Sequence, residues 1–335
     1  MPDVSLQPFG ETISCKDDET ILAGVLRQGH YIRYGCKGGG CGTCKVLLVD
    51  GDVEETGSPF ALPASERANG WILACSSVPL EDSIIDVESM ELTEEDFRAG
   101  DQTGSYAARL ERLDPLTADI SFLRLRLDVP MKFVAGQFVN VFPPGSDESR
   151  SYSMANPPSQ PDVIELIVKL LPGGFFSTYL RERARAGDRL VVQGPYGMLR
   201  IRLSHRRILM VAGGSGMAPL LSMLTDLAEK GNTRPVTFFF GARRWPDLYF
   251  EGRVRELELA MPLNFIPALS EEWPDDWTGE TGLVSDAVAR RLPNLEGYDA
   301  YLCGPPPMID ATRPLLVARG VRERNIYFDA FAPTG

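Results

Sequence analysis

The sequence has 335 residues, of which 44% are hydrophobic and 24% are charged, and its formal net charge is −12. This length predicts two or three domains, each with its own core. We find neither a signal peptide at the start of the chain nor the roughly 20 unbroken apolar residues that a membrane-spanning helix needs. We therefore expect a cytoplasmic protein with no membrane partner.

The negative charge is concentrated in the first part of the chain. Residues 1–100 hold 18 Asp and Glu against 7 Lys and Arg, whereas the other residues hold 28 against 27. Nucleic acid is excluded as a partner, because phosphate binding requires a basic surface. The acidic residues either keep this segment in solution or form a docking face for a basic patch on another protein.

The first predicted domain, residues 1–93, alternates short strands with glycine-rich loops. Residues 4–6 and 11–13 predict a hairpin, residues 18–28 predict a helix, and residues 45–49 and 84–87 predict strands. The acidic, glycine-containing residues 94–104 are typical of an interdomain linker.

Cysteine spacing carries the chemistry of this segment. Cys36, Cys41, Cys44 and Cys75 have the spacing C-x4-C-x2-C-x30-C, which is the plant-type ligand pattern of a [2Fe–2S] cluster. The glycines among the first three allow the tight backbone that such a cluster requires. The alternatives are buried thiols or a structural zinc site, although zinc sites usually pair two CxxC units.

Residues 105–203 form the second predicted domain, which is rich in strands. Polar and apolar residues alternate over residues 120–127 and 163–170, and glycine and proline clusters separate the strands. The pattern predicts an antiparallel β-barrel.

Two motifs in this domain suit a dinucleotide flavin. The first motif is the run Arg150-Ser151-Tyr152-Ser153. Arg150 can neutralise a phosphate, Tyr152 can pack on the isoalloxazine ring, and Ser153 can form a hydrogen bond near the reactive N5 atom of that ring. A later turn is expected to cradle phosphate before a helix, and its residues are Gly173, Gly174 and Ser177. The alternative is a barrel loop with a surface arginine.

The third predicted domain, residues 204–335, alternates strands with helices. Strands are expected at residues 208–212, 236–240 and 300–303, and helices at residues 219–229, from about 250, and at 308–319. This alternation predicts a doubly wound parallel sheet.

Glycine-rich turns follow two of these strands. The first turn would direct backbone N–H groups and a helix N-terminus at a pyrophosphate, and it contains Gly213, Gly214, Ser215, Gly216 and Pro219. The second contains Cys303, Gly304 and Pro305 and would hold the Cys303 side chain beside a nicotinamide ring. A buried turn with an inert cysteine is the alternative.

These motifs, in this order, cover nearly the whole chain. Together they resemble the reductase components of bacterial multicomponent diiron monooxygenases, such as those of soluble methane monooxygenase and phenol hydroxylase. The resemblance implies a multidomain α+β and α/β fold. An N-terminal β-grasp ferredoxin would be followed by an antiparallel FAD barrel and a doubly wound NAD domain. It implies that the four cysteines ligate iron, that the barrel motifs hold FAD, and that the two later turns hold NADH.

The same resemblance implies an NADH-dependent oxidoreductase. Hydride would pass from NADH to FAD, with Ser153 and Cys303 positioning the reactants, and single electrons would then pass through the cluster to a diiron hydroxylase docked at the acidic ferredoxin domain. Phe331 would shield the flavin, although a packed terminal strand explains it as well. The alternatives are a reductase serving a Rieske-type aromatic-ring dioxygenase and a redox-silent regulatory or binding protein.

Two sites in the third domain bear on the choice between NADH and NADPH. NADPH-using relatives place a Ser-Arg pair after the third strand, and here the equivalent pair is Ser270 and Glu271. A carboxylate there would repel the 2′-phosphate, which favours NADH, whereas Arg243 and Arg244 argue for NADPH.

Overall fold

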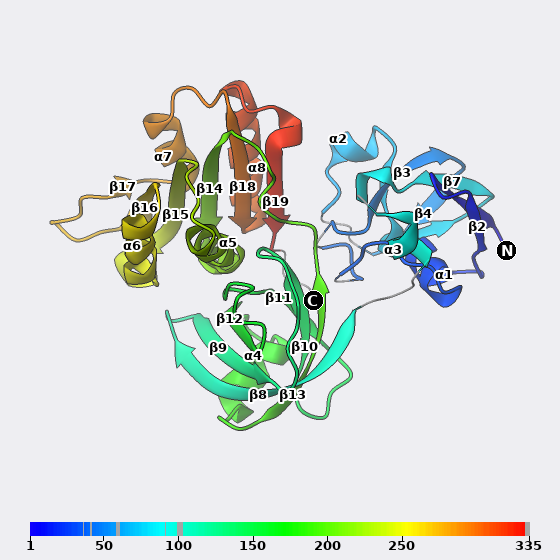
Figure 1. Ribbon diagram of the computed structural model, residues 1–335, viewed down its shortest axis with the longest axis horizontal. Coiled ribbons are helices and arrows are strands. Elements are labelled where there is room, and N and C mark those ends of the chain that lie inside the picture. The colour runs from blue at the N-terminus through cyan, green and yellow to red at the C-terminus, as the bar shows by residue number, and fades with distance from the viewer. Residues whose placement is uncertain (36, 41, 58–60, 91, 99–102, 332–335) are drawn as a thin grey trace. The chain divides into compact units, whose positions relative to one another are not determined.

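The computed structural model describes the chain except residues 36, 41, 58–60, 91, 99–102 and 332–335, and Figure 1 shows its elements. Two compact units are present. The first comprises Met1–Gly104 with Tyr196–Met198, and the second comprises Ser105–Pro195 and residues 199–331.

The first unit is built on a five-stranded mixed sheet in the order β2-β1-β7-β3-β5. Its strands are β1 (Asp3–Gln7), β2 (Glu11–Ser14), β3 (Lys45–Asp50), β5 (Trp71–Leu73) and β7 (Ser83–Asp86), and β4 (Val53–Glu55) pairs separately with β6 (Ser77–Pro79). β1 forms the expected hairpin with β2 and runs parallel to β7. The predicted β-grasp fold is confirmed.

The helix of this unit starts later than its sequence pattern indicates. α1 (Ile21–Arg27) begins after Thr20, whose hydroxyl accepts a hydrogen bond from the Ala23 amide at 3.3 Å. Asp18 has a φ of 59°, which no helix accommodates. The prediction of a helix from residue 18 is therefore wrong by one turn, because an N-cap and not the acidic run sets its start.

Part of the predicted linker is a helix packed onto the first unit. α3 (Glu94–Arg98) buries Phe97, whose ring lies 4.5 Å from that of Phe9 and 4.7 Å from that of His30. The Phe97 carbonyl also accepts a hydrogen bond from the Tyr31 amide at 2.9 Å. The linker prediction is therefore wrong for residues 94–98, because one buried aromatic side chain anchors an otherwise acidic segment.

The second unit begins with a six-stranded antiparallel sheet in the order β11-β10-β13-β8-β9-β12. Its strands are β8 (Gly104–Pro115), β9 (Ile120–Leu127), β10 (Phe138–Phe142), β11 (Arg150–Ser153), β12 (Val163–Lys169) and β13 (Arg189–Tyr196). A bridge between Met154 and Leu166 joins the two edge strands. The predicted barrel is confirmed, and α4 (Phe175–Thr178) follows β12.

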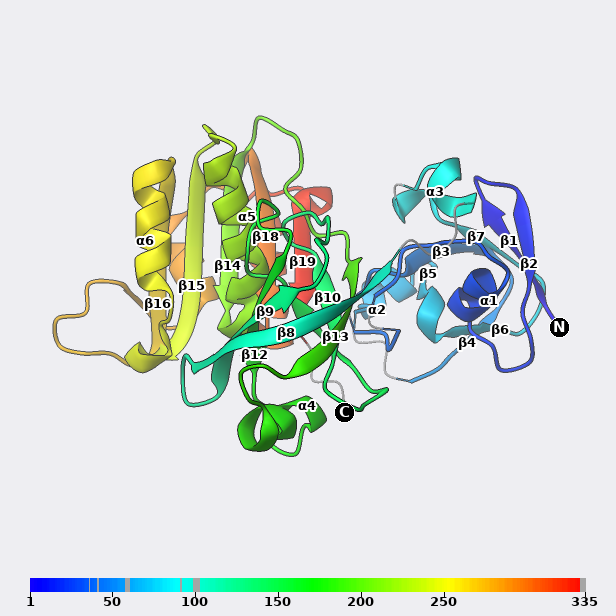
Figure 2. The same cartoon turned by 60° about the horizontal axis from the view of Figure 1, so that its bottom comes forward.

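The rest of this unit is a six-stranded parallel sheet in the order β17-β16-β15-β14-β18-β19. Its strands are β14 (Arg207–Gly213), β15 (Val236–Arg244), β16 (Leu263–Glu272), β17 (Glu280–Thr281), β18 (Tyr298–Gly304) and β19 (Ile326–Ala330). The intervening helices are α5 (Met217–Glu229), α6 (Glu251–Ala260), α7 (Val284–Arg291) and α8 (Pro306–Ala318). Figure 2 shows α5 and α6 along the sheet.

Both faces of this sheet are buried. Met210 and Ala212 of β14 belong to one apolar cluster with helix α5, while Leu209 and Val211 belong to another with α7 and α8. Successive side chains of a strand point to opposite faces, so the uninterrupted apolar run of β14 fills both cores. The predicted doubly wound sheet is confirmed. Within the described residues, no helix is long and apolar enough to cross a membrane.

Candidate functional site

Two of the four predicted iron ligands lie in the described part of the first unit. Cys44 and Cys75 are both buried, and the Ala74 amide donates a 3.0 Å hydrogen bond to the Cys44 carbonyl, which holds the two segments together. Cys36 and Cys41 lie outside the described residues. The neighbouring loop has Gly42 at a φ of +70°, which glycine tolerates without strain. Buried thiols on a tightly turned backbone fit an iron–sulfur cluster.

The first flavin motif forms a strand of the barrel, not a loop. β11 pairs with β10, and the Ser151 hydroxyl donates a 2.6 Å hydrogen bond to the Asn140 side chain. Ser153 is buried, whereas the Arg150 guanidinium is partly exposed and lies 2.7 Å from the Glu148 carboxylate. The Arg150 guanidinium also donates a 2.9 Å hydrogen bond to the Ser149 carbonyl.

The structure brings the second flavin motif beside the first. The Arg150 guanidinium lies 5.8 Å from the ring of Phe175, the first residue of α4, and the Tyr152 ring lies 5.1 Å from that of Phe176. Burial raises the pKa of the Tyr152 hydroxyl, which therefore stays neutral. Ser177 accepts a 2.8 Å hydrogen bond from the Leu171 amide and so closes the turn. Gly173 in that turn has a φ of +69°.

The two predicted nucleotide turns are in backbone contact. β14 and β18 are neighbours, and they lie where the strand order reverses, which is where parallel sheets bind ligands. A Cβ atom added at Gly216 would lie 2.0 Å from the Cys303 carbonyl oxygen, and one at Gly304 would lie 2.7 Å from the Gly213 carbonyl oxygen. Only residues without a Cβ allow the two turns to approach this closely.

Cys303 has no exposed surface. It belongs to an apolar cluster that includes Met217 of α5 and residues of the barrel such as Ile120 and Ala135. Burial raises the pKa of its thiol well above the usual value. A protonated thiol is a weak donor and a poor nucleophile, so this group suits packing or positioning and not covalent chemistry.

Phe331 is bonded to the second nucleotide turn. The Phe331 amide donates a 2.9 Å hydrogen bond to the Gly304 carbonyl, directly after β19. Its ring is partly exposed. The backbone therefore places Phe331 beside Gly304 of the second nucleotide turn.

Both arginines that argued for NADPH have carboxylate neighbours. The Arg243 guanidinium lies 3.7 Å from Glu271, and that of Arg244 lies 3.7 Å from Asp247. The charge of Arg243 is therefore offset by the residue predicted to repel a 2′-phosphate.

One supporting residue has no signal in the sequence. The Tyr249 hydroxyl donates a 2.6 Å hydrogen bond to the Gly214 carbonyl and so holds the first nucleotide turn. Tyr249 follows β15, 35 residues after that turn. No local pattern links the two, and only the parallel order of β14 and β15 brings them together.

Three family models match the chain in the order that its motifs predict. They are the 2Fe-2S iron-sulfur cluster binding domain at residues 4–80, the oxidoreductase FAD-binding domain at 107–201 and the oxidoreductase NAD-binding domain at 210–314. Together they account for all three expected cofactors.

Full-length relatives give the family. The reductase component DmpP of phenol 2-monooxygenase from Pseudomonas sp. (strain CF600) is 39% identical over 98% of this chain and 94% of its own length. The propane 2-monooxygenase reductase component of Rhodococcus jostii (strain RHA1) is 36% identical over 98% of this chain and 90% of its own. The chain belongs to the reductase components of bacterial multicomponent diiron monooxygenases.

A solved structure shares the fold of the whole chain. The Amycolatopsis cytochrome P450 reductase GcoB has a TM-score of 0.78 and 32% identity, and the match covers 99% of each chain. This monooxygenase reductase is therefore an NADH-dependent oxidoreductase that uses FAD and a [2Fe–2S] cluster to supply electrons to a hydroxylase component. The family, fold and cofactor predictions are confirmed.

Proposed function

We propose that hydride enters the reductase where the two nucleotide turns meet beside the barrel and that electrons leave from the acidic first unit. The observation that supports the entry point is the backbone contact between Gly216 and Cys303 at the reversal of strand order. When bound, the flavin accepts a hydride and the iron–sulfur cluster carries single electrons, so the protein has to orient and shield.

Each predicted site residue has a role in this proposal. Arg150 neutralises a flavin phosphate, Tyr152 packs on the ring and Ser153 forms a hydrogen bond near its reactive edge. The neutral, buried Cys303 thiol fills space beside the nicotinamide ring, and Phe331 covers the flavin when nicotinamide is absent. The remaining residues are assigned to the binding sites of FAD and the nicotinamide nucleotide, and they are Ser151, Gly173, Gly174, Ser177, Gly213, Gly214, Ser215, Gly216, Pro219, Gly304 and Pro305.

The iron–sulfur cluster in this proposal is held by Cys36, Cys41, Cys44 and Cys75. Their thiolates require a compartment in which thiols stay reduced, which is the reason for expecting a cytoplasmic location. Nucleic acid and membranes are not partners in this scheme.

The hydroxylase is proposed to dock on the first unit. Its exposed acidic side chains include Asp17, Asp18, Glu54 and Glu55, whereas acidic and basic residues nearly balance in the rest of the chain. Complementary charge mainly speeds the encounter of two proteins, which suits a partner that must bind, receive electrons and leave. A diiron hydroxylase is favoured over a Rieske dioxygenase because the relatives at 39% and 36% identity serve phenol and propane monooxygenases.

Charge-neutralised variants test the docking proposal. We would compare Asp17→Asn/Asp18→Asn and Glu54→Gln/Glu55→Gln with the control Asp275→Asn/Asp276→Asn, two exposed acids of the second unit. At low salt, at least one first-unit pair should raise the concentration of reductase that half-saturates hydroxylation, while NADH–ferricyanide activity stays unchanged. Equal behaviour of the first-unit pairs and the control would refute docking through these acids.

Removal of the first unit tests the wider division of labour. Truncation before Ser105 should leave NADH–ferricyanide activity and end hydroxylase support. This boundary follows the end of the first unit at Gly104. Equal loss of both activities would contradict the proposal.

A further inference from the structure

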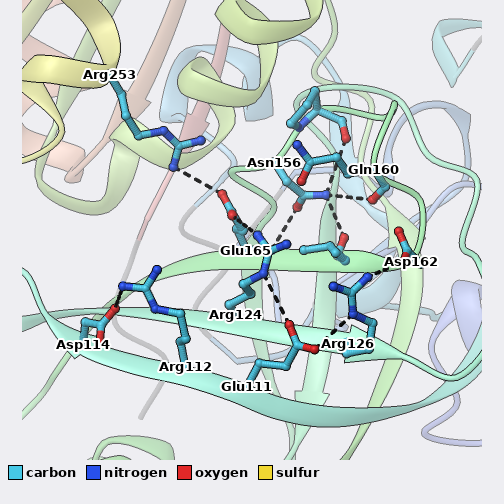
Figure 3. Close-up of polar contacts among 12 residues, drawn as sticks. Glu111, Arg112, Asp114, Arg124, Arg126, Asn156, Gln160, Asp162, Glu165 and Arg253 are labelled. Carbon is cyan, nitrogen blue, oxygen red and sulfur yellow. Dashed lines mark hydrogen bonds and ion pairs between the residues drawn. The ribbon is translucent and has the colours of Figure 1, made fainter.

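Residues 156–165, which run from the end of β11 into β12, are joined to the helices of the nucleotide sheet by three polar links. The Ser222 hydroxyl of α5 donates a 2.6 Å hydrogen bond to the Asn156 carbonyl. The Ser159 hydroxyl donates to the Glu229 carboxylate of α5 at 2.9 Å. The Arg253 guanidinium of α6 lies 3.2 Å from the Glu165 carboxylate, as Figure 3 shows. Both helices are thus connected to one short stretch of the barrel.

Asn156 makes this stretch rigid. Its side-chain oxygen accepts a 2.9 Å hydrogen bond from the Glu165 amide, and its side-chain nitrogen donates to the Val163 and Gln160 carbonyls at 2.7 and 3.2 Å (Figure 3). Asn156 is fully buried, as is Ser222. Because buried polar groups that lose a partner are costly, the two ends of this link are held in one arrangement.

The Glu165 carboxylate is buried between two guanidinium groups. Arg124 of β9 lies 2.5 Å from one of its oxygens, and Arg253 contacts the other. Arg124 also contacts Glu111, a partly exposed residue of β8 that pairs with Arg126 of β9. Removing Arg253 therefore leaves Glu165 paired with Arg124, so the link between the barrel and α6 can be cut without stranding a buried charge.

These links lie close in sequence to the residues proposed to hold the flavin and the nicotinamide. Asn156 comes three residues after Ser153. Ser222 comes six residues after Gly216 and lies in α5, the helix that follows the first nucleotide turn. A shift of α5 along the barrel would therefore move the nucleotide turn relative to the flavin strand. Small misplacements of about 1 Å can slow a reaction by about 100-fold.

We propose that Ser222–Asn156, Ser159–Glu229 and Arg253–Glu165 form an alignment bracket that sets the position of the nicotinamide ring over the flavin. The inference deepens the proposed function and rests on it. The step served is transfer of one proton and two electrons, as a hydride, from C4 of NADH to N5 of the oxidised flavin, which yields NAD⁺ and the two-electron-reduced flavin. The bracket residues are positioning residues, since none is assigned a contact with either ring.

The test uses full-length reductase with all its cofactors and the double variant Ser222→Ala/Arg253→Met. Arg189→Met is the matched control, because it breaks an ion pair with Asp128 that stays within the barrel and does not involve residues 156–165. Stopped-flow absorbance with NADH, and with NADH deuterated at the transferred position, gives the hydride-transfer rate and its isotope effect. Hydrogen exchange of peptides covering residues 156–165, without NADH, gives a readout independent of activity.

The bracket predicts a decrease of about tenfold in the hydride-transfer rate of the double variant. We expect its KM for NADH to change less than threefold, its isotope effect on turnover to rise, and exchange at residues 156–165 to quicken. The control should stay within twofold of wild type, and Ser222→Thr/Arg253→Lys should recover at least half of the rate.

A wild-type rate and isotope effect in the double variant would overturn the bracket, and so would faster exchange without a slower rate. If the double variant loses flavin, the same criteria apply to the single variants Ser222→Ala and Arg253→Met. Failure of NADH to bleach the wild-type flavin would overturn the proposed function and the bracket together. Equal bleaching rates in wild type and variants would overturn the bracket alone.

Discussion

Substitution of Gly216 by alanine should separate the two nucleotide turns. The added Cβ would lie 2.0 Å from the Cys303 carbonyl oxygen, 2.3 Å from its carbonyl carbon and 2.7 Å from the Gly304 nitrogen. All three are backbone atoms, so no side chain can rotate away. Because ordinary contacts between heavy atoms begin near 3.5 Å, the turns must part by about 1.5 Å.

That separation should impair nucleotide binding and hydride transfer while sparing the flavin. Overpacking of this kind costs about 1–3 kcal/mol of the free energy of unfolding. A displacement of more than about 1 Å is expected to lower kcat/KM for NADH by about 100-fold in the ferricyanide assay. FAD content should stay at the wild-type level, because the flavin motifs lie on β11 and at α4 with the turn before it.

Gly252→Ala is the matched control for this variant. Gly252 lies in α6, and a Cβ there would meet no atom within 4 Å. Alanine in a helix is favoured over glycine by up to about 1 kcal/mol, so activity should be unchanged and stability equal or higher. A kcat/KM for Gly216→Ala within twofold of the control would refute the claim that these turns must touch.

Three further predictions concern other parts of the chain. Glu271→Gln should free Arg243 from its carboxylate neighbour and raise kcat/KM for NADPH relative to NADH by about tenfold, or 1.4 kcal/mol; an unchanged ratio of the two coenzymes would argue against Glu271 as the selector. The hydrogen bond from Arg27 lowers the pKa of Glu19 from 4.5 to about 2, so Glu19 stabilises the fold above pH 4.5 and this contribution is lost as pH falls toward 2. Urea titrations at several pH values should show a shallower acid loss of stability for Glu19→Gln than for wild type, and parallel curves would contradict the ion pair. Phe97→Ala should destabilise the first unit by about 3–5 kcal/mol, measured by urea denaturation, whereas a loss below about 1 kcal/mol would mean that α3 does not anchor the segment.

Local sequence patterns were sufficient for the elements that carry the chemistry. The apolar run over residues 208–212 and the glycines that follow it predict a strand, a tight turn and a helix, and these are β14, its turn and α5. Alternation over residues 120–127 predicts β9 at its observed bounds. Such patterns succeed because burial on one or both faces of a strand fixes the identity of neighbouring residues.

Long-range contacts account for what the sequence did not reveal. Phe97 reads as a lone aromatic in an acidic segment, and only its ring contacts with Phe9 and His30 make α3 part of the first unit. Arg243 and Glu271 gave opposing predictions of coenzyme choice until adjacent strands placed them 3.7 Å apart. The bracket residues carry no motif, because serine, asparagine and arginine acquire their partners only from the packing of α5 and α6 on the barrel.

One anaerobic experiment tests the electron path most directly. Stepwise addition of NADH to the oxygen-free protein should bleach the flavin absorbance and, within the same titration, produce the EPR signal of a reduced [2Fe–2S] cluster, approaching one spin per chain. A flavin that bleaches fully while the cluster stays EPR-silent would show that the two centres do not exchange electrons, and the account would be wrong.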